Sequence, residues 1–121
     1  MRLGMAALLI THDPTGLSGL ADRLMVVYGG ILVEDGPFVE VYRRPLHPYT
    51  RYLLAAIPPT MTQHKRIPLP VLALSAWPAA PSSSGCPFEP RCPDRMPECS
   101  VQLPEAVITG GRQVRCFRYG E

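Results

Sequence analysis

The stretch Leu24-Met-Val-Val-Tyr-Gly-Gly-Ile-Leu-Val-Glu-Asp35 carries the clearest structural signal in this sequence of 121 residues. Two runs rich in β-branched and aromatic residues flank two glycines, and glycine tolerates the positive φ angles that a tight turn requires. The pattern therefore predicts a β-hairpin, which Gly36 and Pro37 should end.

A continuous apolar run, Met5-Ala-Ala-Leu-Leu-Ile10, precedes the hairpin. Such a run is typical of a strand buried on both faces in a parallel sheet, although its period is also compatible with a buried helical turn. Asp13 is suited to cap a short helix over residues 15–21, but Gly16 and Gly19 would weaken that helix by about 1 kcal/mol each. We expect a strand, then a loop, then a weak helix.

The same apolar run is too short to be a targeting signal. Its six residues fall below the roughly 7–15 of a signal-peptide core and the roughly 20 of a membrane span. The sequence therefore predicts no transmembrane segment and a cytoplasmic protein, which would meet a membrane only through a partner.

After the hairpin, the chain should form short elements interrupted by proline. Residues 38–43 and 49–56 have the pattern of two short helices, and the 15 prolines and 10 glycines limit the length of any element. Residues 60–85 are rich in proline, serine and alanine, which is typical of a linker. The expected fold class is α/β, with residues 1–59 in one unit and a small irregular cysteine-rich lobe, residues 86–121, in another.

The net charge of +2 gives no support for nucleic-acid binding, for which a strongly basic face is the usual footprint. The densest basic clusters are residues 43–44 and 64–66, and both are typical of solvated surface. A nucleic-acid binder built on the cysteine-rich lobe is a weaker alternative, with Phe88, Phe117 and Tyr119 as its stacking residues. We expect no nucleic-acid partner.

All four cysteines, Cys86, Cys92, Cys99 and Cys116, lie within the last 36 residues and are spaced C-x5-C-x6-C-x16-C. Clustered cysteines in a cytosolic chain favour metal or cluster ligation over disulfides, because cytosolic thiols are kept reduced. Structural zinc usually takes a pair of cysteines about two to four residues apart, whereas wider gaps can surround a larger object such as a four-iron cubane. The spacing predicts ligation by these cysteines, with free or disulfide-linked thiols as the alternative.

Four segments of the sequence, taken in order, share a resemblance to one known family. Ala7-Leu-Leu-Ile-Thr-His-Asp13 is similar to the strand and switch loop that close the ATPase domain of the ATP-binding subunit of an ABC transporter, and residues 21–36 are similar to the hairpin that follows. His47-Pro-Tyr-Thr-Arg-Tyr-Leu-Leu-Ala-Ala-Ile-Pro58 narrows the resemblance to importers of oligopeptides and dipeptides. Gly85-Cys-Pro-Phe-Glu-Pro-Arg-Cys-Pro93 resembles the C-terminal extension of that branch.

The resemblance implies that the complete family member binds ATP with magnesium between two ATP-binding subunits. It implies peptide import through transmembrane permease subunits, which would hold the subunit on the inner face of the cell membrane. It also implies that His12 is the switch histidine, whose imidazole stabilises charge at the γ-phosphate. Some members of the family carry a [4Fe–4S] cluster, so the resemblance favours iron and sulfide over zinc as what Cys86, Cys92, Cys99 and Cys116 bind.

Parts that ATP hydrolysis requires are missing from this sequence. A phosphate-binding loop needs the pattern G-x-x-x-x-G-K-[ST], but Lys65 is the only lysine and no such loop surrounds it. The family's magnesium-binding aspartate and catalytic glutamate also have no counterpart here. We expect a truncated ATP-binding subunit that does not hydrolyse ATP alone, and the alternative is a stand-alone metal- or iron–sulfur-binding interaction module without a nucleotide function.

Overall fold

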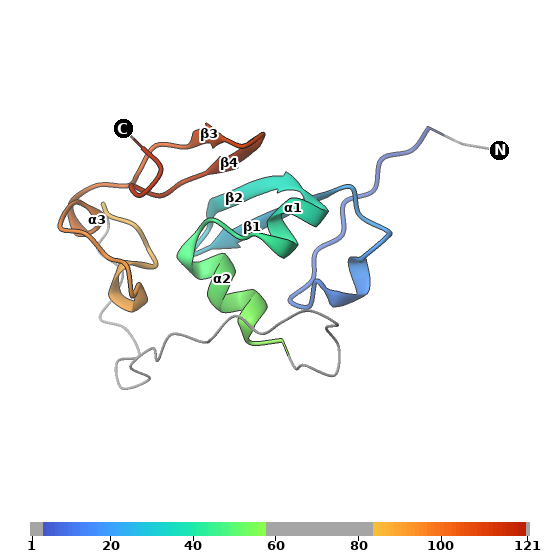
Figure 1. Cartoon of the computed structure of the whole chain (residues 1–121), viewed down its shortest axis with the longest axis horizontal. Helices are drawn as coiled ribbons and strands as arrows, with labels where there is room; N and C mark the ends of the chain where they lie inside the picture. Colours follow the sequence, from blue (N-terminus) through green and yellow to red (C-terminus); the bar gives the residue numbers. More distant parts are fainter. Residues whose placement is uncertain (1–3, 58–83, 121) are drawn as a thin grey trace.

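The computed structural model describes residues 4–57 and 84–120. The first part contains strands β1 (Arg23–Tyr28) and β2 (Ile31–Pro37) and helices α1 (Phe38–Arg43) and α2 (Pro48–Ala55). The second part contains helix α3 (Glu98–Val101) and strands β3 (Val107–Thr109) and β4 (Arg112–Val114). Single 3-10 turns lie at Thr15–Leu17 and Glu89–Arg91. The chain is therefore mixed α/β, with a small antiparallel sheet and short helices (Figure 1).

Strands β1 and β2 form the hairpin that the sequence predicts. The two strands pair antiparallel along their length, and the pairing closes with Tyr28 opposite Ile31. Gly29 and Gly30 make the turn with φ angles of 56° and 79°, which are the positive values that a mirror-image two-residue turn demands. The hairpin prediction is confirmed.

Replacing Gly30 with alanine should destabilise the chain by about 1–2 kcal/mol, because a Cβ atom is unfavourable in a left-handed backbone. No atom lies within 4 Å of the added Cβ, so the loss would come from the backbone conformation alone. Gly16→Ala is the matched control, because its Cβ also meets open space and its φ angle is not positive. Urea unfolding followed by circular dichroism measures both, and equal midpoints for the two variants would contradict the prediction.

Strands β3 and β4 form a second hairpin, whose turn is Gly110 and Gly111 with φ angles of 57° and 73°. On its other side β4 pairs with β2, so the sheet has the order β1-β2-β4-β3 (Figure 1). The expectation of an irregular lobe is therefore wrong for residues 107–114, because these short strands gain a partner that is distant in the sequence. The expected linker lies outside the described residues except for its last two, so the division into residues 1–59, 60–85 and 86–121 stays a prediction.

The two predicted helices after the first hairpin are confirmed, and α2 begins one residue earlier than expected. Helix α1 buries Phe38 and Val41, and the ring of Tyr42 stacks on Phe38 with 5.4 Å between the ring centroids. Helix α2 has Pro48 in its first turn, where the missing N–H would have no helical partner. None of the helices in residues 4–57 and 84–120 is long and apolar enough to cross a membrane.

The N-terminal segment differs from the prediction. Residues 5–10 form no strand, and Met5, Leu8 and Ile10 are 80%, 81% and 92% exposed. The expected strand in a parallel sheet is wrong for the chain described here, because none of the described strands pairs with this run. The expected helix over residues 15–21 is reduced to the 3-10 turn at Thr15–Leu17, before which Asp13 Oδ1 accepts a hydrogen bond from the Thr15 N–H at 2.9 Å.

Two clusters of buried apolar side chains meet beside the first hairpin. One joins β1, β2 and α1, and consists of Val26, Val33 and Val41. The other belongs to the cysteine-rich part, and consists of Cys86, Phe88 and Cys99. Tyr28 and Tyr49 pack against both clusters, with their ring centroids 4.4 Å apart. Residues 84–120 are therefore packed against the hairpin and α2, and they are joined to the hairpin through the sheet.

Candidate cysteine-lined site

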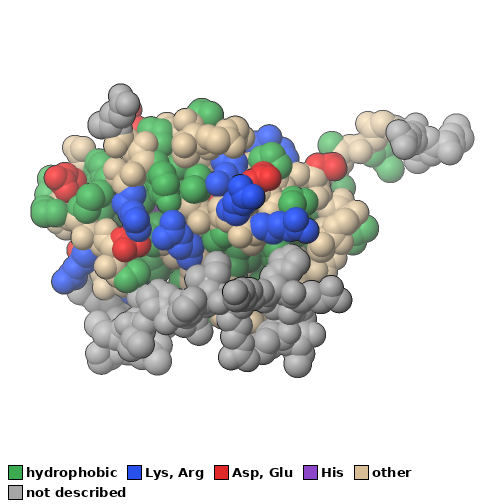
Figure 2. Space-filling view, in the orientation of Figure 1, with side chains coloured by type: hydrophobic (Ala, Val, Ile, Leu, Met, Phe, Trp, Pro, Cys, Tyr) green, Lys and Arg blue, Asp and Glu red, His purple; other side chains and the backbone are tan. Residues whose placement is uncertain are grey.

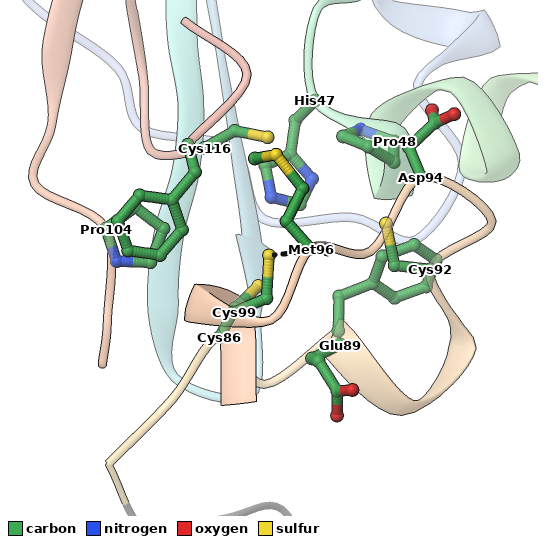
Figure 3. Close-up of a pocket in the computed structure, with 12 residues that line it drawn as sticks. His47, Pro48, Cys86, Glu89, Cys92, Asp94, Met96, Cys99, Pro104 and Cys116 are labelled. Atoms are coloured by element: carbon green, nitrogen blue, oxygen red, sulfur yellow. Dashed lines mark hydrogen bonds between the residues drawn. The ribbon is translucent and has the colours of Figure 1, made fainter. Parts of the chain in front are cut away.

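One pocket of the described structure is lined by all four cysteines. Cys86, Cys99 and Cys116 are buried, Cys92 is half-buried, and all are free thiols. Figure 3 shows these side chains projecting into the same space from separate stretches of chain, together with His47 and Met96. The structure therefore brings together the residues that the sequence singles out as ligands.

A backbone hydrogen bond holds Cys86 and Cys99 side by side. The Cys86 N–H donates to the Cys99 carbonyl at 2.8 Å. Cys99 lies in the one-turn helix α3, and its Sγ accepts a hydrogen bond from the Met96 N–H at 3.4 Å. A backbone N–H aimed at a sulfur stabilises negative charge there, so this arrangement suits a thiolate ligand.

Cys92 and Cys116 reach the pocket from two other elements. Cys92 follows the 3-10 turn Glu89–Arg91, and its N–H donates to the Glu89 carbonyl at 3.1 Å. Cys116 lies two residues after β4, where the Arg115 N–H donates to the Val33 carbonyl at 2.9 Å. The pairing of β4 with β2 therefore brings the most distant cysteine in the sequence to the other three.

The pKa values of three of the four thiols show that the pocket is a desolvated environment. Burial raises the pKa of Cys92 from 9.0 to about 11, and burial likewise raises the pKa of Cys86 and of Cys116. The cysteines also act on one another, since negative charge on Cys86 or Cys116 raises the pKa of Cys92 further. In the chain alone Cys86, Cys92 and Cys116 are protonated at neutral pH, so a metal or cluster must displace their protons on binding.

The geometry does not contain a ready-made site for a single metal ion. Within residues 4–57 and 84–120, no three His, Cys, Asp or Glu side chains lie close enough together to hold one ion. The donor set is nevertheless chemically uniform: four thiols in a mainly apolar pocket, which is the ligand type of iron–sulfur centres and of all-cysteine zinc sites.

His47 lies at the start of α2 and lines the same pocket. Its side chain is 1% exposed, and its Nδ1 caps the helix by accepting the Tyr49 N–H at 3.0 Å. Burial, and secondarily the positive charge of Arg51, lower the pKa of His47 from 6.5 to about 4. The imidazole is therefore neutral at physiological pH.

Glu34, in the middle of β2, anchors the chain on which His47 lies. Its carboxylate is fully buried and accepts the Leu46 N–H at 3.0 Å and the His47 N–H at 2.9 Å. The guanidinium of Arg112 lies 3.6 Å from the same carboxylate and is also buried. Sequence reasoning missed both Glu34 and His47; the signal for Glu34 was an acidic residue next to an apolar run in a predicted strand.

Polar contacts close the side of the pocket near α2. Asp94, which lines the pocket, forms an ion pair with Arg118 and lies 3.9 Å from Arg51. The Tyr119 hydroxyl accepts a hydrogen bond from Arg51 at 3.0 Å and donates one to the Leu46 carbonyl at 2.9 Å. These contacts fix the C-terminal turn and the segment after Cys92 against α2.

His12 is separate from this pocket. It lies in the exposed N-terminal loop and is not among the residues that line the cysteine site. The loop has its own local order, because Thr11 Oγ1 accepts the Asp13 N–H at 3.0 Å. A role for His12 at a nucleotide stays a prediction.

Comparison with known proteins identifies the family to which this chain belongs. A family model described as "Oligopeptide/dipeptide transporter, C-terminal region" matches residues 33–99, which is more than half of the chain. The match runs from β2 through α2 to Cys99. The chain belongs to this family.

Curated relatives agree with the family match. A peptide import ATP-binding protein of Brucella abortus is 41% identical over 114 residues, which are 94% of this chain and 34% of that protein. The oligopeptide transport ATP-binding protein OppF of Escherichia coli is 38% identical over 119 residues, which are 96% of this chain and 35% of that protein. The chain spans about a third of the length of the relatives that it matches.

Proposed function

We propose that this chain forms the C-terminal part of an ATP-binding subunit of a peptide importer of the ABC class. The observation that supports this most directly is the similarity of nearly the whole chain to proteins named for peptide import and ATP binding. In this proposal the assembled subunit binds ATP with magnesium, faces a second ATP-binding subunit, and works on transmembrane permease subunits at the cytoplasmic face of the membrane. His12 would act at the γ-phosphate, and the nucleotide-binding loop would come from outside this chain.

For the cysteine-lined pocket we propose a [4Fe–4S] cluster, with zinc as the alternative occupant. Four buried or half-buried thiols from separate elements line one pocket, which supports a shared centre over isolated structural thiols. Such a cluster, when bound, stores or transfers one electron at a time. The residues of this chain that would hold it are Cys86, Cys92, Cys99 and Cys116.

Replacing any one of these cysteines with serine should remove most of the bound iron and acid-labile sulfide, because a hydroxyl is a harder and poorer donor to iron–sulfur iron. The whole chain would be reconstituted with iron and sulfide without oxygen, and iron, sulfide and visible absorption measured per chain. Val101→Ser is the control, because it introduces the same residue at a position of α3 that is 68% exposed. Colourless protein with one zinc per chain, or four thiols that bind neither metal, would contradict the cluster.

A stand-alone metal-binding interaction module is the second candidate. The residues that line the pocket favour it, because none of them precedes His47 in the sequence and the N-terminal segment therefore contributes none. The two functions differ in their partners: an importer subunit should be recovered from native membranes together with permease subunits, whereas a module of this kind should not. Recovery without permease subunits would support the module.

A further inference from the structure

The imidazole of His47 connects the first turn of α2 with the cysteine-lined pocket. Figure 3 shows the ring directed into the space that the cysteine side chains surround, although the backbone of His47 belongs to the segment before α2. Helix capping alone does not require a histidine, because asparagine, aspartate and serine are the usual residues for that role. The ring therefore offers the pocket a second nitrogen that the cap does not use.

The contacts of His47 determine which nitrogen carries its hydrogen. Nδ1 accepts the Tyr49 N–H at 3.0 Å, so the lone pair of Nδ1 is engaged and the hydrogen of the neutral ring is on Nε2. The backbone of the same residue is fixed, since the His47 N–H donates to the buried Glu34 carboxylate at 2.9 Å. The ring is thus held in one orientation with Nε2 as a donor.

This donor has no acceptor among residues 4–57 and 84–120, where the hydrogen bond from Tyr49 is the only one that the His47 side chain makes. His47 is only 1% exposed, so solvent can hydrate this N–H only poorly, and an acceptor inside the pocket would stabilise it. Sulfur atoms are the abundant acceptors in this pocket, and thiolate or sulfide sulfur accepts hydrogen bonds better than a neutral thiol does.

We propose that His47 donates its Nε2–H to a sulfur atom in the cysteine pocket and thereby raises the reduction potential of the iron–sulfur centre held there. The inference rests on the proposed cluster. A hydrogen bond to sulfur stabilises the more negative, reduced state over the oxidised one, so it makes the centre easier to reduce. His47 is then a tuning residue that touches the centre without being one of its four ligands.

Two substitutions at His47 separate its role as a hydrogen-bond donor to the pocket from its role as the cap of α2. His47→Asn keeps an oxygen where Nδ1 accepts the Tyr49 N–H, but its shorter side chain cannot reach the position of Nε2. His47→Gln is the converse, because its amide N–H can occupy the position of Nε2 whereas its oxygen is poorly placed for the cap. Thr50→Ala is the control for α2, since Thr50 is fully buried in the first turn and does not line the pocket.

The reduction potential would be measured on the whole chain after reconstitution with iron and sulfide without oxygen. We expect His47→Asn to shift the reduction potential to a more negative value. The reduction potentials of His47→Gln and Thr50→Ala should stay near that of the unsubstituted chain. Electron–nuclear double resonance of the reduced protein in deuterated water gives a second readout. Besides the coupling of the Met96 N–H, which donates to Cys99 Sγ in every variant, one further exchangeable proton coupled to the cluster should be present in the unsubstituted chain and in His47→Gln, and absent in His47→Asn.

The outcomes distinguish the inference from the proposed cluster on which it rests. If the unsubstituted chain binds a cluster, but His47→Asn changes neither the potential nor the exchangeable-proton coupling, the inference is wrong and the cluster stands. If Thr50→Ala shifts the potential as much as His47→Asn, the effect belongs to α2 and the inference is again wrong. If the unsubstituted chain binds no iron and sulfide, both fail together.

Discussion

Glu34→Ala should destabilise the chain by about 3–5 kcal/mol, which is the usual loss when one partner of a buried ion pair is removed. The substitution takes away the acceptor of the Leu46 and His47 N–H groups and leaves the Arg112 guanidinium buried without its carboxylate. Arg112 is only 8% exposed, so solvent cannot replace the lost charge. A loss of this size is a large part of the roughly 5–15 kcal/mol that stabilises a typical domain.

Denaturant unfolding of the cluster-free chain, followed by far-ultraviolet circular dichroism, measures this loss. Glu40→Ala is the matched control, because it removes an exposed carboxylate from α1 and should change stability by less than about 0.5 kcal/mol. The loss of stability in Glu34→Gln should lie between those of Glu34→Ala and Glu40→Ala, because the amide oxygen can still accept a hydrogen bond from one of the two N–H groups. Hydrogen exchange adds a local test: the Leu46 and His47 amides should lose protection in Glu34→Ala. A Glu34→Ala midpoint equal to that of Glu40→Ala would show that the carboxylate is not a structural anchor.

Acid should destabilise the cluster-free chain well above the pH at which carboxylates are protonated, because His47 is buried in its neutral form. Its pKa is about 4 in the folded chain and 6.5 in the unfolded reference. Between these values the unfolded chain binds a proton that the folded chain does not, so stability is complete above pH 6.5 and decreases as the pH falls towards 4. The full difference corresponds to about 3 kcal/mol, and about 2 kcal/mol should be lost by about pH 5.

The pH effect has a structural cause that can be tested by substitution. A proton on Nδ1 would remove the acceptor of the Tyr49 N–H, so protonation also breaks the cap of α2. Unfolding free energies measured from about pH 7.5 to 5 should fall for the unsubstituted chain and stay nearly constant for His47→Asn, which caps the helix without titrating. Parallel curves for the two chains would assign the pH dependence to other groups.

The comparison of the two hairpins shows which strands a local sequence pattern can predict and which it cannot. Both turns consist of two glycines with positive φ angles, at Gly29-Gly30 and at Gly110-Gly111. The first was predictable because long β-prone runs flank it, whereas the second joins strands of three residues each, which are too short to give a pattern. Strand β4 is stabilised by its pairing with β2, and such long-range pairing is not visible in a local window.

The N-terminal apolar run, residues 5–10, was predicted to form a strand and does not form one. Its apolar residues predicted burial, but burial in a sheet also requires neighbouring strands, and the described chain supplies none there. For the site, residue type and clustering identified the four cysteines, and the structure places all of them on one pocket. Glu34 was not predictable as an anchor, because the groups that its carboxylate binds lie far along the chain. The place of His47 in the pocket was not predictable either, because the cysteines that line the pocket with it are distant in the sequence.

The aromatic contact between the two core clusters gives this chain an intrinsic optical probe. Tyr28 and Tyr49 lie 4.4 Å apart, and Phe88 meets Tyr28 edge-on with 5.3 Å between the ring centroids. Chromophores this close, held at fixed angles, couple their electronic transitions and give a near-ultraviolet circular dichroism band that free tyrosines lack. Tyr28 is on β1, Tyr49 on α2 and Phe88 in the cysteine-rich part, so the band has its full intensity only when all three are assembled. The same spectrum can therefore follow the docking of residues 84–120 while the visible region follows the filling of the pocket.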